Sequence, residues 1–131
     1  DLERKVRYAM SFHGARYIHI LVPCPLGWGA PSAKTIELAR LAHETGLFPV
    51  FEAEYGEVTN VSKIRRKQPV EKYLMLQKRF AHLFGKKGNP EIVQRMQALA
   101  DRNIARYGLL GDEQGDDIPV PEQAEERHHV I

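Results

Sequence analysis

The chain has 131 residues, of which 43% are hydrophobic and 27% are charged, a composition typical of one soluble globular domain. No apolar run reaches the roughly 18–20 residues that a membrane-spanning helix needs, so we expect no membrane contact. The single cysteine excludes an internal disulfide, which favours a cytoplasmic location. The chain does not begin with Met, and its first residues already form a helical pattern, which predicts a segment of a longer protein.

Charge is distributed unevenly along the chain. Residues 1–111 carry 18 Lys and Arg against 10 Asp and Glu, whereas residues 112–131 carry one Arg against seven acids. The body is therefore basic and the tail is acidic, although the net charge is only +2. A basic surface favours an anionic partner, such as a phosphate cofactor, an acidic protein or nucleic acid, without choosing among them.

The first elements in chain order are a helix, a buried strand and a rigid loop. A helical pattern covers residues 1–12 and ends at Gly14. Residues 17–22 are almost all apolar and β-prone, which is typical of an interior strand of a parallel sheet. Three prolines and two glycines make residues 23–31 a rigid, irregular loop.

The rest of the chain predicts further helices and one hairpin. Ser32 is a candidate N-cap for the next helix, and Asn89 followed by Pro90 is a candidate start for the last one. The predicted elements are a helix over 33–45, a strand over 48–55 that turns at Gly56 into a hairpin with 57–62, a helix over 70–84 and a helix over 89–107. This order predicts the end of an α/β sheet with a helical extension.

The strongest candidate for a functional residue is Cys24. It lies two residues past the predicted strand, and ligands gather at the carboxyl ends of strands in open α/β sheets. Pro23 and Pro25 restrict its backbone, which would hold a thiolate ready for a metal cluster, and Leu26 and Trp28 could shield that cluster from water. The alternative is a packed cysteine without a ligand role, because a lone Cys is usually a small buried hydrophobe.

The residues around Cys24 resemble a known family. The segment Tyr17-Ile-His-Ile-Leu-Val-Pro-Cys-Pro-Leu-Gly-Trp28 is similar to the strand and Pro-Cys-Pro-x-Gly-Trp loop of the beta subunits of 2-oxoacid:ferredoxin oxidoreductases of the pyruvate class. The similarity continues through Lys34–Glu37, Leu41–Gly46, Phe48–Glu52 and Lys67–Phe80, and weakens after residue 84. It therefore covers about residues 1–84.

This resemblance implies both a fold and a set of cofactors. Residues 1–84 would be the C-terminal part of a parallel-sheet domain that binds thiamine diphosphate, 85–111 a helical extension, and 112–131 an acidic tail. Cys24 would be one ligand of a 4Fe-4S cluster. The other three cysteines, and the residues that bind thiamine diphosphate and Mg, would lie upstream of this segment. No residue here is assigned a catalytic role.

The implied activity is the coenzyme A-dependent oxidative decarboxylation of a 2-oxoacid, with electrons passing to ferredoxin or a similar acceptor. The expected partners are the other subunits of the oxidoreductase complex. Gly27-Trp28 favours a pyruvate-like substrate by resemblance, while phenylglyoxylate, branched 2-oxoacids and oxalate stay open.

The rival interpretation is a non-catalytic basic module that binds nucleic acid or an acidic protein. Its basis is the cluster Lys63, Arg65, Arg66 and Lys67, which is more often a solvated turn, together with Lys86-Lys87. The basic residues are not interleaved with exposed aromatic residues and no recognition motif is present, so nucleic acid is an unlikely partner. Among the histidines, His19 is expected in the core, and none of the six has the spacing of a metal site.

Overall fold

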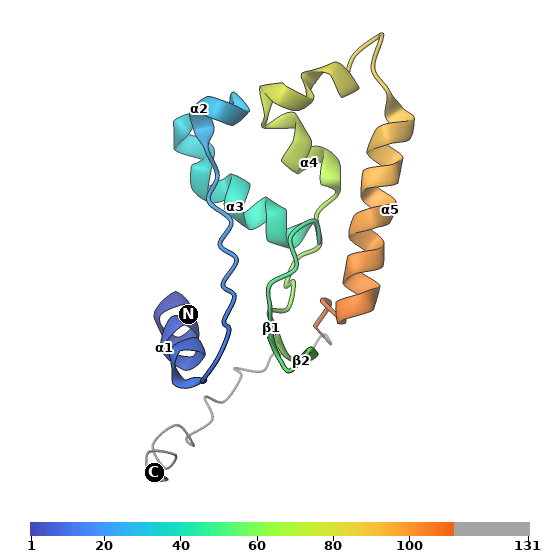
Figure 1. Ribbon diagram of the computed structural model, residues 1–131. Helices are drawn as coiled ribbons and strands as arrows, with labels where there is room; N and C mark the ends of the chain where they lie inside the picture. Colours follow the sequence, from blue (N-terminus) through green and yellow to red (C-terminus); the bar gives the residue numbers. More distant parts are fainter. Residues whose placement is uncertain (112–131) are drawn as a thin grey trace, which may run out of the picture.

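The computed structural model describes residues 1–111, in which helices predominate and the only strands form one hairpin (Figure 1). The predicted acidic tail lies outside the described residues. No helix of the described part is both long and apolar enough to cross a membrane. The elements are α1 Leu2–Ser11, α2 Pro25–Trp28, the 3-10 helix η1 Ser32–Lys34, α3 Thr35–Glu44, β1 Phe51–Glu54, β2 Glu57–Val61, α4 Val70–Met75, the 3-10 helix η2 Lys78–Leu83 and α5 Pro90–Tyr107.

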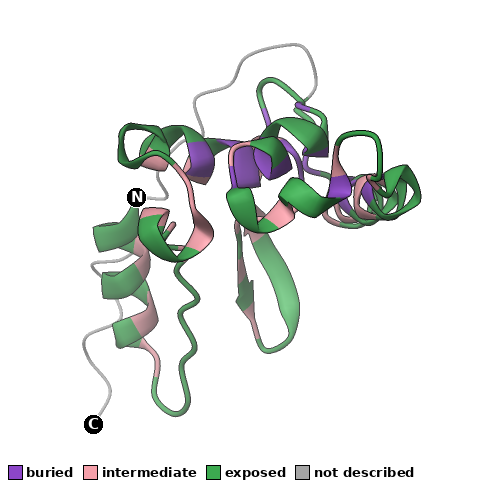
Figure 2. Ribbon diagram, turned by 90° about the horizontal axis from the view of Figure 1, so that it is seen from above, coloured by how far each residue is buried: buried purple, intermediate pink, exposed green. Residues whose placement is uncertain are grey.

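The core lies between α3, α4, η2 and α5. Each of these helices contributes buried apolar side chains, such as Leu38 from α3, Leu74 from α4, Leu83 from η2 and Ala100 from α5. Figure 2 shows the buried residues concentrated in this group, while α1 and the hairpin are mostly exposed. The predicted division at residue 84 stays a prediction, and α5 shares the core of the preceding helices.

The helix predicted over 70–84 is broken in the middle. Gln77 is buried and its backbone is extended, so α4 stops at Met75 and η2 begins at Lys78. The Gln77 side-chain amide donates to the Tyr73 carbonyl at 2.7 Å, which is the acceptor that the Gln77 backbone N–H would use in a continuous helix. The apolar periodicity did not carry this information, because the break comes from a side-chain hydrogen bond.

The predicted helix starts have different outcomes. Asn89 caps α5 as predicted, since its side chain accepts a hydrogen bond from the Ile92 N–H at 3.2 Å. The prediction that Ser32 caps the helix over 33–45 is wrong. Residues 32–34 form a 3-10 turn first, and the Ser32 carbonyl accepts a hydrogen bond from the Thr35 hydroxyl at 2.7 Å.

The predicted hairpin is confirmed, with a shorter first strand than expected. β1 and β2 pair antiparallel, and Glu54 lies opposite Glu57 at the turn. Tyr55 and Gly56 both have positive φ, of 51° and 90°, which is the geometry that a tight two-residue hairpin turn requires. The hairpin is the only sheet among the described residues, apart from one isolated parallel bridge between Ile64 and Leu110.

The interior strand predicted over 17–22 is not formed within residues 1–111. The segment is extended, but it pairs with no strand of residues 1–111, and Tyr17 and Val22 are 85% and 71% exposed. Leu21 is the exception, because it packs against the helical core. A β-strand forms only when a neighbouring strand accepts its backbone hydrogen bonds, and the described chain offers none here. The mixed helix and strand composition is observed, whereas a parallel sheet is not seen in residues 1–111.

Candidate functional site

Cys24 begins a single helical turn at the end of the exposed segment. It is the N-cap of α2, and its Sγ accepts a hydrogen bond from the Gly27 N–H at 3.4 Å. The Cys24 carbonyl also accepts a hydrogen bond from the Trp28 N–H at 2.9 Å, and the Pro25 carbonyl accepts one from the Ala30 N–H at 2.9 Å. The predicted irregular loop is thus a defined turn with the thiol at its start. Cys24 is exposed in the described chain.

The space beside the sulfur depends on Gly27. A Cβ atom at this position would lie 3.2 Å from Cys24 Sγ, which is closer than nearly all real contacts of that kind. Because glycine has no Cβ, the sulfur stays open on this side. Leu26, two residues after Cys24 in the same turn, is 94% exposed. An open sulfur, a backbone N–H donor and an apolar neighbour suit one ligand position of an iron–sulfur cluster.

The Cys24 turn is held on the helical core through its second half. Gly29 has a φ of 65°, and its carbonyl accepts a hydrogen bond from the Lys78 N–H at 3.3 Å. The Arg79 guanidinium lies 4.2 Å from the centre of the Trp28 ring and donates to the buried Gln77 side chain at 2.8 Å. These contacts tie the turn to η2. The same Gln77 that breaks the predicted helix therefore also helps to position the turn.

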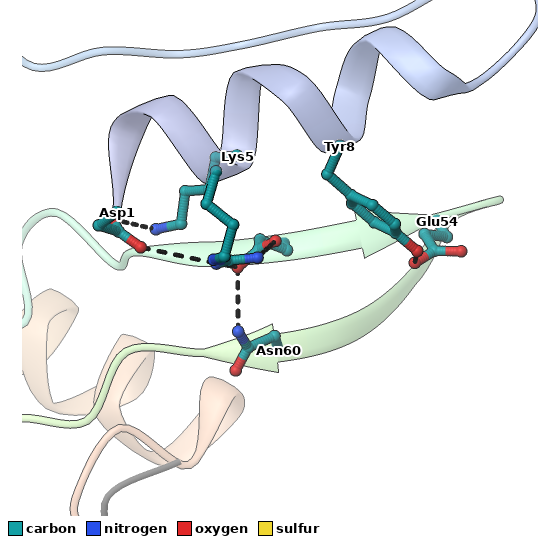
Figure 3. Close-up of polar contacts among 7 residues, drawn as sticks. Asp1, Lys5, Tyr8, Glu54 and Asn60 are labelled. Carbon is teal, nitrogen blue, oxygen red and sulfur yellow. Dashed lines mark hydrogen bonds and ion pairs between the residues drawn. The ribbon is translucent and has the colours of Figure 1, made fainter. Parts of the chain in front are cut away.

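The other end of the exposed segment follows α1, which is held on the hairpin by polar contacts. Figure 3 shows α1 running alongside the hairpin, with polar side chains between the helix and the strands. Arg4 donates to both oxygens of Glu52, at 2.5 and 3.1 Å, and Asn60 donates to the same carboxylate at 2.9 Å. The Tyr8 hydroxyl donates to Glu54 at 2.7 Å. Residues 17–22 therefore connect two anchored parts of the chain, α1 on one side and the Cys24 turn on the other.

The charges of this network shift the pKa values of its members. The hydrogen bond from Arg4 lowers the pKa of the Glu52 carboxyl, against an opposing effect of burial, and Asn60 adds to the lowering. The same hydrogen bond raises the pKa of Arg4. Burial lowers the pKa of Lys5, which forms an ion pair with Asp1 at 2.8 Å. Glu52 is therefore an ionised anchor for α1. The sequence showed only its alternation with apolar neighbours, so it did not predict this role.

Cys24 belongs to no cluster of three or more potential metal ligands in the described residues. Residues 1–111 contain no group of three or more His, Cys, Asp or Glu side chains that could hold a metal ion. His19 is exposed, with its ring edge-on to Phe48 at 5.2 Å between centroids, so the expectation of a core histidine is wrong. His43 Nε2 lies 3.4 Å from the Lys63 carbonyl. His128-His129 lies outside the described residues. Cys24 could therefore supply only one ligand, as the resemblance implies.

The basic cluster at residues 63–67 is divided between structural contacts and free charges. Lys63 Nζ donates to the Gly108 carbonyl at 2.7 Å, at the C-terminal end of α5, where a cation complements the helix dipole. Lys67 forms an ion pair with Asp101 at 2.7 Å, and this contact lowers the pKa of the Asp101 carboxyl. Half of the cluster therefore stabilises α5, which removes much of the basis for a nucleic-acid-binding module.

Comparisons with known proteins find several similar sequences. No protein-family model matches the chain. The chain is 49% identical over 109 residues to pyruvate synthase subunit PorB of Methanosarcina barkeri, which covers 83% of the chain and 37% of that protein. It is 35% identical over 141 residues to pyruvate synthase subunit PorB of Pyrococcus furiosus, and 39% identical over 97 residues to ketoisovalerate oxidoreductase subunit VorB of Pyrococcus abyssi. These two matches cover 94% and 72% of the chain, and 40% and 30% of the relatives.

These relatives share one enzyme class, the oxidoreductases that act on 2-oxoacids. The chain belongs to the family of the beta subunits of 2-oxoacid:ferredoxin oxidoreductases, of which it is a segment. It spans between 30% and 40% of the length of the relatives described above, so it corresponds to a minor part of each.

Proposed function

We propose that this chain is part of an enzyme that carries out the coenzyme A-dependent oxidative decarboxylation of a 2-oxoacid and passes the electrons to ferredoxin or a similar acceptor. The substrate would be pyruvate or a related 2-oxoacid. Thiamine diphosphate and Mg would be bound mainly by residues outside this segment, and the other subunits of the complex would be its partners. The support is the sequence similarity to pyruvate synthase and ketoisovalerate oxidoreductase subunits over 72–94% of the chain.

The role proposed for this segment is to provide Cys24 as one thiolate ligand of a 4Fe-4S cluster. When bound, such a cluster accepts and donates single electrons. The observation that carries the proposal is the accessible Sγ at the start of α2, with the Gly27 N–H donating to it and no side chain on Gly27 to obstruct it. Hydrogen bonds to a ligand sulfur and nearby apolar groups both tune a cluster's potential.

The experiment is Cys24→Ser in the intact complex, with Ser32→Ala as the control. Ser is close in size to Cys, so the turn should persist, while one ligand is replaced. We expect the iron content to fall by about four atoms per beta subunit or the cluster to become labile, with a changed low-temperature EPR signal of the reduced complex. Electron transfer should fall much more than thiamine diphosphate binding. Full iron content, an unchanged signal and near-normal electron transfer would reject the ligand role.

We also propose that residues 17–22 become an interior strand of the parallel-sheet domain when the rest of the protein is present. The segment is already extended, and its apolar side chains Ile18, Ile20 and Val22 are exposed in the described chain. Apolar residues on both faces are typical of a strand covered by helices on both sides. Hydrogen exchange of the full-length subunit should show backbone amides 18–22 strongly protected. Fast exchange of these amides in the assembled complex would reject this pairing.

The substrate is best tested on the whole complex. A panel of pyruvate, branched 2-oxoacids, phenylglyoxylate and oxalate, with coenzyme A and a low-potential dye as acceptor, would rank them by kcat/KM. We expect pyruvate to rank first. No turnover of any 2-oxoacid by the intact complex would reject the proposed activity.

A further inference from the structure

Arg79 is an exposed residue of η2 whose guanidinium group makes three directional contacts. The group lies 4.2 Å from the centre of the Trp28 ring and 4.8 Å from the centre of the Phe80 ring. Its Nε donates to the Gln77 side-chain oxygen at 2.8 Å. A guanidinium group is planar and stacks on aromatic faces, which the compact ammonium group of lysine does not do. These contacts together fix one orientation of a side chain that is otherwise surrounded by solvent.

The Gln77 side chain that orients Arg79 is itself held by the core. Gln77 is only 1% exposed, and its amide nitrogen donates to the Tyr73 carbonyl at 2.7 Å. The nitrogen of this amide is therefore committed to α4 and its oxygen to Arg79. A buried polar group with both ends bonded is rigid. The position of the Arg79 guanidinium is thus set by the packed helices.

Trp28 connects this arrangement to the sulfur of Cys24. The Trp28 N–H donates to the Cys24 carbonyl at 2.9 Å, and the N–H of the preceding residue, Gly27, donates to Sγ at 3.4 Å. A shift of Trp28 would therefore change both hydrogen bonds. The backbone contact from the Lys78 N–H to the Gly29 carbonyl is 3.3 Å long, beyond the usual range, so it holds the turn only loosely. The Trp28 ring is the second point at which the turn is attached.

We infer that Arg79 is a positioning residue for the cluster ligand, acting through the Trp28 ring on the turn that carries Cys24. The inference rests on the ligand role proposed above for Cys24. Groups that orient a metal ligand without touching the metal typically change metal affinity by roughly 10–100-fold. Arg79 acts one residue further away, through Trp28, so we expect a smaller effect of about three- to ten-fold. Because Arg79 is exposed, its loss should loosen the turn and leave the helical core intact.

The first test measures iron release from the intact complex to a chelator. The relevant iron is the fraction that Cys24→Ser removes. We expect both Arg79→Ala and Arg79→Lys to release this fraction about three- to ten-fold faster than the wild type, since lysine keeps the charge but not the planar group. The matched control is Arg95→Ala, because Arg95 is an exposed arginine whose ion pair with Glu91, at 2.6 Å, stays within α5. It should release iron at the wild-type rate.

Hydrogen exchange of the same complexes separates positioning from a general loss of structure. In Arg79→Lys, peptides that cover residues 24–30 should exchange faster than in the wild type, because the Gly27 and Trp28 amides lie in the loosened turn. Peptides from α4 and α5 should exchange at the wild-type rate. A purely structural role of Arg79 would instead speed exchange in those helices too.

A double variant tests whether Arg79 acts through the Trp28 ring. Trp28→Leu removes the ring, so adding Arg79→Ala in this background should cause no further increase in iron release. Independent effects would multiply the two rates. The ratio of the rates with and without Arg79 therefore reports the coupling directly.

The outcomes distinguish this inference from the proposed function. Wild-type iron release in Arg79→Ala, full rescue by Arg79→Lys, faster exchange throughout α4 and α5, or independent effects in the Trp28→Leu background would each overturn the positioning role. If Cys24→Ser lowers the iron content while the Arg79 variants behave as the wild type, the ligand role stands and only the role of Arg79 is rejected. Full iron content in Cys24→Ser would overturn the ligand role and, with it, this inference.

Discussion

Gly29 is the position where a single methyl group should detach the Cys24 turn from the core. Its φ of 65° is a left-handed conformation that costs an L-residue about 1–2 kcal/mol. In addition, a Cβ on Gly29 would lie 2.7 Å from the Cβ of Lys78, a distance that real Cβ atoms essentially never show. Relieving such overpacking typically costs a further ~1–3 kcal/mol. The total destabilisation expected for Gly29→Ala is therefore about 2–5 kcal/mol.

Gly85→Ala separates the two contributions. Gly85 also has a positive φ, of 88°, but a Cβ there would meet no atom within 4 Å. Its substitution should cost only the backbone term of about 1–2 kcal/mol. The free energy of unfolding of each variant can be measured by urea denaturation followed by circular dichroism. We expect Gly29→Ala to be less stable than Gly85→Ala by at least about 1 kcal/mol.

A double variant tests the cause of this difference. Lys78→Gly removes the atom that the new Cβ would strike, so Gly29→Ala should cost less in this background than in the wild type. The backbone cost would remain. Equal destabilisation by Gly29→Ala and Gly85→Ala, or no relief in the Lys78→Gly background, would refute the proposed close contact between the turn and η2.

Three further predictions concern the anchors of the fold. Because Arg4 lowers the pKa of the Glu52 carboxyl, the contribution of this ion pair to stability is fully present above the ordinary Glu pKa of 4.5 and is lost as the pH falls through the lowered folded pKa. Glu52→Gln should therefore flatten the dependence of the unfolding free energy on pH in this range. An unchanged pH profile would contradict this prediction. Leu74→Ala should cost about 2–5 kcal/mol, since Leu74 is fully buried, whereas its exposed neighbour Met75→Ala should cost under ~1 kcal/mol, and equal losses would argue against this core. Asn89→Ala should destabilise the chain by about 1 kcal/mol through loss of the α5 cap, while no change in urea midpoint would count against the cap.

The local elements were largely predictable from the sequence, because they depend on neighbours in the chain. The hairpin turn at Tyr55-Gly56 requires residues with positive φ, and the start of α5 requires the Asn89 side chain, so short-range chemistry is sufficient for both. The break after Met75 was not predictable, since it depends on whether the Gln77 side chain is buried against the Tyr73 carbonyl. Burial is a property of the packed helices, and periodicity alone does not report it.

The candidate site divides in the same way. The sequence by itself determined that Cys24 lies in a proline-bounded turn next to an apolar segment, and similarity to relatives follows from those same residues. Only the tertiary structure decided that the sulfur is open, that the turn rests on η2 through Gly29, and that Lys63 and Lys67 serve α5. It also decided that residues 17–22 pair with nothing in the described chain. An apolar sequence specifies a preference for burial, but a strand exists only where a second segment supplies hydrogen-bond partners, and that depends on three-dimensional arrangement.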